Sequence, residues 1–390
     1  MLAKTSQTAI INVINFSIQL RECLMRRLII FTAFVVLSVF FVIASPGASV
    51  VAQGETCSSF INQALDQLSS NCGDLPRNSA CYGYNSVQAT FFDALSPDAF
   101  SQPNDRVELA ALQSITTSPL DTVTQEWGIA VVKAQANLPD ALPGQAVTFL
   151  LLGDVQLTTG VEQGSDQNPM QAVYFTTGIS DTRCTDAPES SLIIQGPEDI
   201  TVNIRVNGAD IQLGSTAVFR STPNNTMECG VLDGAALVGG SQVIPAGFAA
   251  RVPLNAQLNT AGSWGGNQLI GTDNATTLQV LKEIPEGVLN YTPDVPSAEE
   301  VTLLGSLDSR LVTALDSHVL RDLVRLLIAQ GANPEFVVEW DVQTLRDYIA
   351  TNAAAVSEAT VEPSSTAEPL TSEVVETVLA ALDDFMNQQE

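Results

Sequence analysis

Residues Ile200 to Arg220 read ITVNIRVNGADIQLGSTAVFR and carry the strongest β pattern of the chain. Apolar residues occupy every second position from Ile200 to Val206, and polar residues occupy the positions between them. This period of two is that of a β-strand with one buried face. An Asn-Gly pair at 207–208 forms a turn signal, and the alternation then resumes at Ile211. The stretch therefore predicts a hairpin within a β-sandwich or a rolled sheet.

Short apolar runs of the same kind precede this stretch. Three of them are WGIAVVKAQANLP (127–139), QAVTFLLLGDVQLT (145–158) and QAVYFTTG (171–178). Turn-forming residues such as Pro143-Gly144 separate them, a pattern that is typical of mainly β proteins. We therefore expect a β domain over residues 196–292, preceded by a disulfide-bearing α+β domain over residues 53–195.

The alternation stops near Pro293, and helical spacing replaces it. Ser297 and Glu300 form a capping-box pattern, and leucines recur at helical spacing until Gly331 and Pro334. We expect a helical region over 293–352, including a last helix over 341–352, and a disordered acidic Ser/Thr/Pro linker over 353–372. An amphipathic helix over 373–390 closes the chain. Its apolar side either docks a partner or folds back onto residues 297–352.

The N-terminal 52 residues have the pattern of an export signal. Arg26-Arg27 precede the apolar run LIIFTAFVVLSVFFVIA, which begins at Leu28 and ends at Ala44. Pro46-Gly47 and the small-residue site at 50–52 follow it, as expected of a cleaved signal sequence with a start at Met1 or at Met25. The alternative is an uncleaved membrane anchor, since seventeen apolar residues are at the lower limit for spanning a bilayer. Both alternatives place the rest of the chain outside the cytoplasm, in a secreted or surface-bound form.

Five cysteines follow this segment: Cys57, Cys72, Cys81, Cys184 and Cys229. Exported thiols generally pair, and the spacings here are wider than those of zinc sites. We expect two disulfide bonds among the first four cysteines, which flank a short helix over 58–68. Their connectivity is open. Cys229 shares a strand face with Met227 and Val231, and we expect it to be a buried free thiol.

The charge of the chain excludes several kinds of partner. It has 43 acidic and 16 basic residues, and its formal net charge is −27. Such a surface repels phosphate backbones and anionic membranes, so we expect no nucleic-acid binding. Membrane contact is expected only through residues 28–44, if they are retained. The remaining partners are a protein or a cell-wall polysaccharide.

Candidate catalytic groups are few. His318 is the only histidine, and a leucine-rich helical pattern surrounds it, which is typical of a structural position. Glu126 beside Trp127 and the AGSWGGNQ stretch around Trp264 resemble parts of sugar-binding or glycosidase sites. Trp127 also fits a core strand, because apolar residues follow it. Oxygen-rich loops such as DQNP (166–169) have calcium-binding residue types without an EF-hand pattern. We expect no catalytic residue, cofactor or metal site.

Residues 200–254 resemble the FecR-like domain of bacterial envelope proteins. The resemblance rests on VNGADIQLGSTAVFR (206–220), MECGVLDGAALVGGSQ (227–242) and VIPAGFAARVPL (243–254). It implies a β fold without a reactive group. The family is named for an iron-citrate sensor that crosses the inner membrane, with a folded cytoplasmic domain before the membrane helix. Here only about 26 residues precede the apolar run. The part from 77 to 155 is similar to uncharacterised exported proteins that place it before a FecR-like segment.

These observations favour a non-catalytic exported cell-envelope protein that binds or scaffolds an unidentified ligand. Two alternatives stay open. One is a membrane-anchored sensor of the FecR type, and the other is a carbohydrate-active enzyme built on Glu126.

Overall fold

The computed structural model describes residues 53–93, 97–135, 145–164, 168–178, 184, 187–198, 200–222, 224–270, 280–284, 287–353 and 370–389. The predicted signal segment and most of the predicted linker lie outside these residues. The described part is mainly β with a helical C-terminal region, as predicted. Among the described residues, no helix is both long and apolar enough to cross a membrane.

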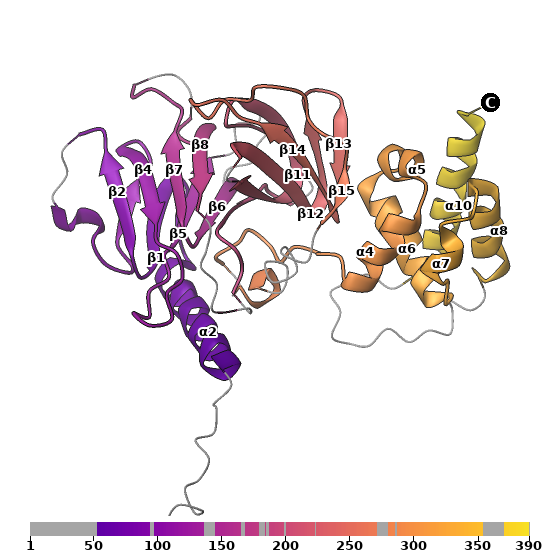
Figure 1. The fold of residues 1–390 in the computed structure, drawn as a ribbon, viewed down its shortest axis with the longest axis horizontal. Helices are drawn as coiled ribbons and strands as arrows, with labels where there is room; N and C mark the ends of the chain where they lie inside the picture. The colour runs from indigo at the N-terminus through magenta and orange to yellow at the C-terminus, as the bar shows by residue number, and fades with distance from the viewer. Residues whose placement is uncertain are drawn as a thin grey trace, which may run out of the picture. The chain divides into compact units, whose positions relative to one another are not determined.

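The described strands belong to one curled sheet (Figure 1). In chain order, the strands are β1 (Ser79–Tyr84), β2 (Val87–Phe91), β3 (Arg106–Glu108), β4 (Leu112–Thr117), β5 (Ile129–Gln135), β6 (Ala146–Leu152), β7 (Val155–Thr159), β8 (Ala172–Thr177), β9 (Ser191–Gln195), β10 (Val202–Val206), β11 (Ala209–Thr222), β12 (Thr226–Val238), β13 (Gln242–Pro245), β14 (Phe248–Pro253) and β15 (Gln268–Leu269). A short 3-10 helix, η1 (Pro97–Phe100), precedes β3. Strands from both sides of residues 195–196 belong to this one sheet, because β8 pairs with β10 and β9 pairs with β11.

The long hairpin of β11 and β12 joins two wings of this sheet. The first part of β11 pairs with β10, and its second part pairs with β9 on the same edge. A register shift lies between Thr216 and Ala217. It follows Ser215, which has a positive φ of 144°. Such a bulge bends a strand and changes its direction. We call β2, β4, β7, β8 and β10 the open wing, and β9, β6, β5, β1 and β3 the covered wing.

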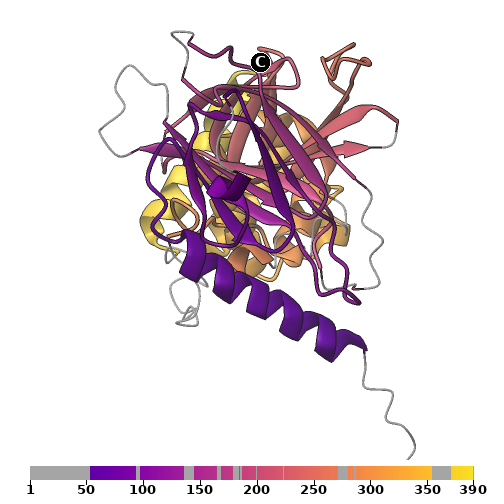
Figure 2. The same ribbon diagram turned by 90° about the vertical axis from the view of Figure 1, so that its left-hand side faces the viewer.

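The two wings differ in burial, and the sequence explains the difference. Every residue of β6 and β9 is buried, because the covered wing contacts apolar side chains on both faces. Its outer face packs against helix α2 (Gln53–Cys72) and the segment around Val288, and Figure 2 shows α2 lying along the sheet. The strands β7 and β10 alternate between buried and exposed residues, so the open wing has a polar outer face.

The cysteines fasten both ends of α2. Cys57 and Cys184 lie at disulfide distance, with their Cα atoms 5.8 Å apart. Cys72 and Cys81 form a second pair, with their Cα atoms 5.9 Å apart. Cys229 is unpaired and fully buried on the same strand face as Met227 and Val231. The apolar stripe of α2, which begins at Phe60, is buried against the sheet.

The C-terminal region is built of α4 (Ala298–Ser306), α5 (Ser309–Ala314), α6 (Ser317–Ala329), α7 (Pro334–Val337), α8 (Val342–Thr351) and α10 (Ser372–Asn387). The predicted capping box is present, since the Ser297 side chain accepts from Glu300 N and the Glu300 carboxylate accepts from Ser297 N. Helix α10 packs against α6 and α8, and Asp383 pairs with Arg346. The terminal helix therefore folds back onto the helices before the linker.

Candidate functional site

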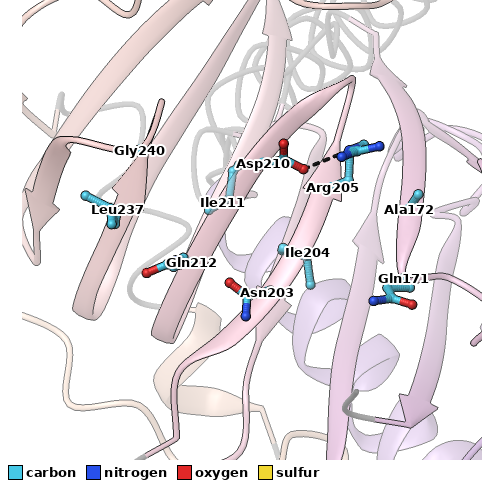
Figure 3. A pocket seen from close by; sticks show the side chains of 10 residues that line it. All are labelled: Gln171, Ala172, Asn203, Ile204, Arg205, Asp210, Ile211, Gln212, Leu237 and Gly240. Atoms are coloured by element: carbon cyan, nitrogen blue, oxygen red, sulfur yellow. Dashed lines mark hydrogen bonds and ion pairs between the residues drawn. The ribbon is translucent and has the colours of Figure 1, made fainter. Parts of the chain in front are cut away.

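The open wing and the neighbouring β11–β12 hairpin form a groove with both polar and apolar lining residues. The cavity measures about 280 Å³ and extends over β8, β10, β11 and β12 (Figure 3). It is lined by Gln171, Ala172, Asn203, Ile204, Arg205, Asp210, Ile211, Gln212, Leu237 and Gly240. Ile204 and Ile211 are buried below the surface, whereas most of the polar lining side chains are exposed.

Strand periodicity places the polar groups of the groove. Asn203 and Arg205 are the outward-facing members of β10, between inward-facing apolar residues. The antiparallel register sets Asn203 opposite Gln212 and Arg205 opposite Asp210. Cross-strand neighbours on one face lie within reach of each other, so the hairpin presents two polar pairs side by side. Figure 3 shows these four side chains on the two adjacent strands.

The edge of the groove at β8 depends on a short parallel pairing. Only two residue pairs join β8 to β10, and Arg205 N donates to Gln171 O at 3.0 Å. The buried side chain of Asn207 continues the ladder, since Phe175 N donates to its Oδ1 at 2.8 Å and its Nδ2 donates to Phe175 O at 3.0 Å. Asn207 has a positive φ of 48°, a conformation that asparagine tolerates better than most residues. It therefore ends β10 and fixes its position beside β8.

The charges in the groove neutralise each other. Arg205 Nε donates to Asp210 Oδ1 at 2.8 Å, and both side chains are more than half exposed. The hydrogen bond to Asp210 and the attraction of its carboxylate raise the pKa of Arg205. Solvent weakens an ion pair of this kind, so its contribution to stability is small. Its consequence for binding is a lining without net charge.

Three amide side chains in the groove have no partner among the described residues. The side chains of Gln171, Asn203 and Gln212 form no hydrogen bond with the part of the protein that the structure describes. Each amide has an acceptor oxygen and two N–H donors. Such groups suit a ligand that both donates and accepts hydrogen bonds, as sugar hydroxyls do. Among the described residues that line the groove there is no histidine, cysteine or serine.

The candidate residues of the sequence are not brought together. Glu126 is exposed and forms an isolated bridge with Asp121, whereas Trp127 is fully buried in the core. His318 is exposed at the start of α6, where its backbone N–H donates to Asp316. Trp264 is half-buried, and its ring packs over Gly239, which precedes the groove residue Gly240. A Cβ atom added at Gly239 would lie 3.3 Å from Trp264 Cδ1. The described residues contain no cluster of ligands that could hold a metal ion.

A second cavity of about 260 Å³ lies beside Asn290 and Tyr291. Asn290 Nδ2 donates to Ala146 O at 2.8 Å, and its N–H donates to Gln195 Oε1 at 2.8 Å. The Tyr291 hydroxyl lies 2.6 Å from Ser215 Oγ at the bend of β11. These hydrogen bonds tie the segment after 287 to the covered wing. They give this region a structural role.

Asp233 extends this network toward the helices. Its Oδ2 accepts from Asp294 N at 3.2 Å, and the Asp294 carboxylate pairs with Arg325 and Arg321 of α6. Burial raises the pKa of the Asp233 carboxyl, the hydrogen bonds from Ser215 and Asp294 N lower it, and the nearby Asp294 charge raises it. The overall pKa of Asp233 is raised.

The alternation in residues 200–206 predicts the strand that carries the groove, but no local pattern predicts the groove itself. The polar positions Asn203 and Arg205 were visible in the alternation, and they are the signal that could have marked an exposed polar face. Gln171 joins them only through the pairing of β8 with β10, which no local pattern indicates.

Comparison of the chain with family models, curated proteins and solved structures finds no match. The resemblance of residues 200–254 to the FecR-like domain therefore stays a prediction.

Proposed function

We propose that this chain is an exported, non-catalytic binding protein that holds a neutral polysaccharide of the cell envelope in the groove on the open wing. The observation that carries this proposal is the set of three unpartnered amides, at Gln171, Asn203 and Gln212. Asn203 and Gln212 lie on β10 and β11, and Gln171 directly precedes β8, so binding would cost little ordering of the backbone.

The charges favour a neutral ligand over an anionic one. The Arg205–Asp210 pair cancels within the groove, and the chain as a whole has a net charge of −27. A polyanion approaching this surface is repelled, and the groove offers no excess positive charge in compensation. Hydroxyl groups, in contrast, match the mixed donors and acceptors of the amides.

Export fits the two cysteine pairs, because disulfide bonds persist mainly in oxidising compartments. The signal pattern in residues 1–52 supports the same compartment. A location in the cell envelope or outside the cell would bring the groove into contact with polysaccharide.

Affinity electrophoresis tests the proposal. The purified protein is run through native gels that contain a soluble neutral β-glucan or, separately, polygalacturonate. We expect the neutral polymer alone to retard the protein. The double variant Asn203→Ala/Gln212→Ala should lose most of the retardation, since each hydrogen bond contributes about 1 kcal/mol.

The matched control is the double variant Gln88→Ala/Gln156→Ala. These two amides are exposed on β2 and β7 of the same wing, outside the groove. Equal loss in both double variants would contradict the assignment to the groove. Retardation by polygalacturonate in place of the neutral polymer would contradict the ligand class.

A further inference from the structure

The helical region has an exposed apolar pair at the turn between α6 and α8. Phe336 is 61% exposed and Val338 is 63% exposed, whereas Val337 between them is buried and anchors the turn. Among the described residues, the other exposed large hydrophobic side chains are Val123, at 75%, and Leu269, at 41%. Single exposed apolar residues are common on protein surfaces, whereas clusters of them mark contact sites. Phe336 and Val338 flank the buried Val337 on one short turn.

Packing holds this pair in place. Helix α7 begins at Pro334, and the side chain of Asn333 caps it by accepting from Glu335 N at 2.9 Å. Two residues after Val338, the ring of Trp340 packs on Tyr348 of α8, with the ring centroids 4.7 Å apart. The apolar pair is therefore presented by an ordered turn, and its ordering cost on binding is small.

The surroundings of the pair are acidic. Glu335 and Glu339 are exposed on either side of it, and neither forms an ion pair with the described residues. No lysine follows Lys282, and the arginines of the helical region all pair with acidic side chains of this chain. The carboxylates beside the pair are thus uncompensated within the described residues.

We propose that Phe336 and Val338, with Glu335 and Glu339, form a docking site for a cationic amphipathic segment of another protein. The apolar side of such a segment would cover the two exposed side chains, and its basic residues would pair with the two glutamates. A second copy of this chain fits poorly, because it would bring a like-charged acidic surface against the site. This proposal is independent of the groove.

Fluorescence anisotropy with a labelled model peptide, KLAKLAKKLAKLAK, tests the proposal on the full chain. A cationic peptide is attracted to any part of an acidic protein, so variants decide the result. We expect Phe336→Ser/Val338→Ser to weaken binding on the order of 10- to 100-fold, from the apolar area that stays exposed. Val123→Ser is the matched control, because Val123 is an exposed valine on another part of the chain and should bind as the wild type does.

Several results would overturn the proposal. These are equal affinity of the wild type and the double variant, equal binding of the acidic analogue ELAELAEELAELAE, and the absence of measurable binding. Sedimentation of the protein alone gives a further contradicting result. If the wild type self-associates and the double variant does not, the surface binds a second copy of the chain. Binding to phosphatidylcholine vesicles that the double variant loses would assign it to lipid.

Discussion

Removal of the two disulfide bonds should destabilise the protein by different amounts. Cys57 and Cys184 are separated by 127 residues in sequence, and Cys72 and Cys81 by 9. A bond that closes a longer loop removes more conformational entropy from the unfolded chain. The loop-entropy relation predicts a loss of about 5 kcal/mol for the first bond and about 2.5 kcal/mol for the second at 25 °C.

The comparison uses two double variants, Cys57→Ala/Cys184→Ala and Cys72→Ala/Cys81→Ala. All four side chains are buried, so the packing lost is similar in both variants and the difference isolates the loop contribution. Urea unfolding followed by circular dichroism gives the free energy of unfolding of each. We expect the first variant to be less stable than the second by about 2 kcal/mol. Equal losses of stability, or a larger loss for the shorter loop, would show that loop length does not set the contribution of these bonds.

Three further predictions follow from single side chains. Asp233 has a raised pKa in the folded state, so the folded protein binds more protons than the unfolded chain and loses stability as the pH rises above the ordinary aspartate pKa. Urea unfolding of Asp233→Asn and of the wild type at several pH values from 4 to 7 tests this. The free energy of unfolding of the variant should rise relative to that of the wild type as the pH rises, and a difference that stays constant would contradict the prediction. Ser297→Ala removes half of the capping box of α4 and should cost about 1 kcal/mol in urea unfolding, whereas Ser297→Asp should restore it. Asn207→Ala leaves the backbone N–H and C=O of Phe175 without their side-chain partners, so it should lower the free energy of unfolding by about 2 kcal/mol or more. It should also weaken the retardation of the protein by neutral glucan. An unchanged midpoint of urea unfolding would show that Asn207 does not fix β8.

Local patterns predicted the elements whose burial and capping depend on near neighbours. The alternation from Ile200 to Val206 corresponds to β10, with its apolar side chains buried. The Ser297 and Glu300 pattern corresponds to the capping box of α4. The apolar stripe of the terminal helix packs against α6 and α8, where Val375, Val378, Leu382 and Phe385 are buried.

Pairing between distant segments could not be predicted in the same way. The sequence suggested a domain boundary at 195 and 196, yet the sheet continues across it through the pairing of β9 with β11. The covered wing is apolar on both faces because α2 packs on it, and α2 lies far from β6 and β9 in sequence. The groove arises from the meeting of β8 with β10, so its lining includes Gln171, which no strand pattern connects to Asn203.

The central claim is that the amides of the groove contact a neutral glycan. The most direct measurement is the ¹H–¹⁵N spectrum of the side-chain amides of the labelled protein, titrated with laminarihexaose. We expect the signals of Gln171, Asn203 and Gln212 to shift with a common dissociation constant, whereas those of Gln88 and Gln156 stay in place. Unchanged groove signals at saturating oligosaccharide, or equal shifts at Gln88 and Gln156, would contradict it.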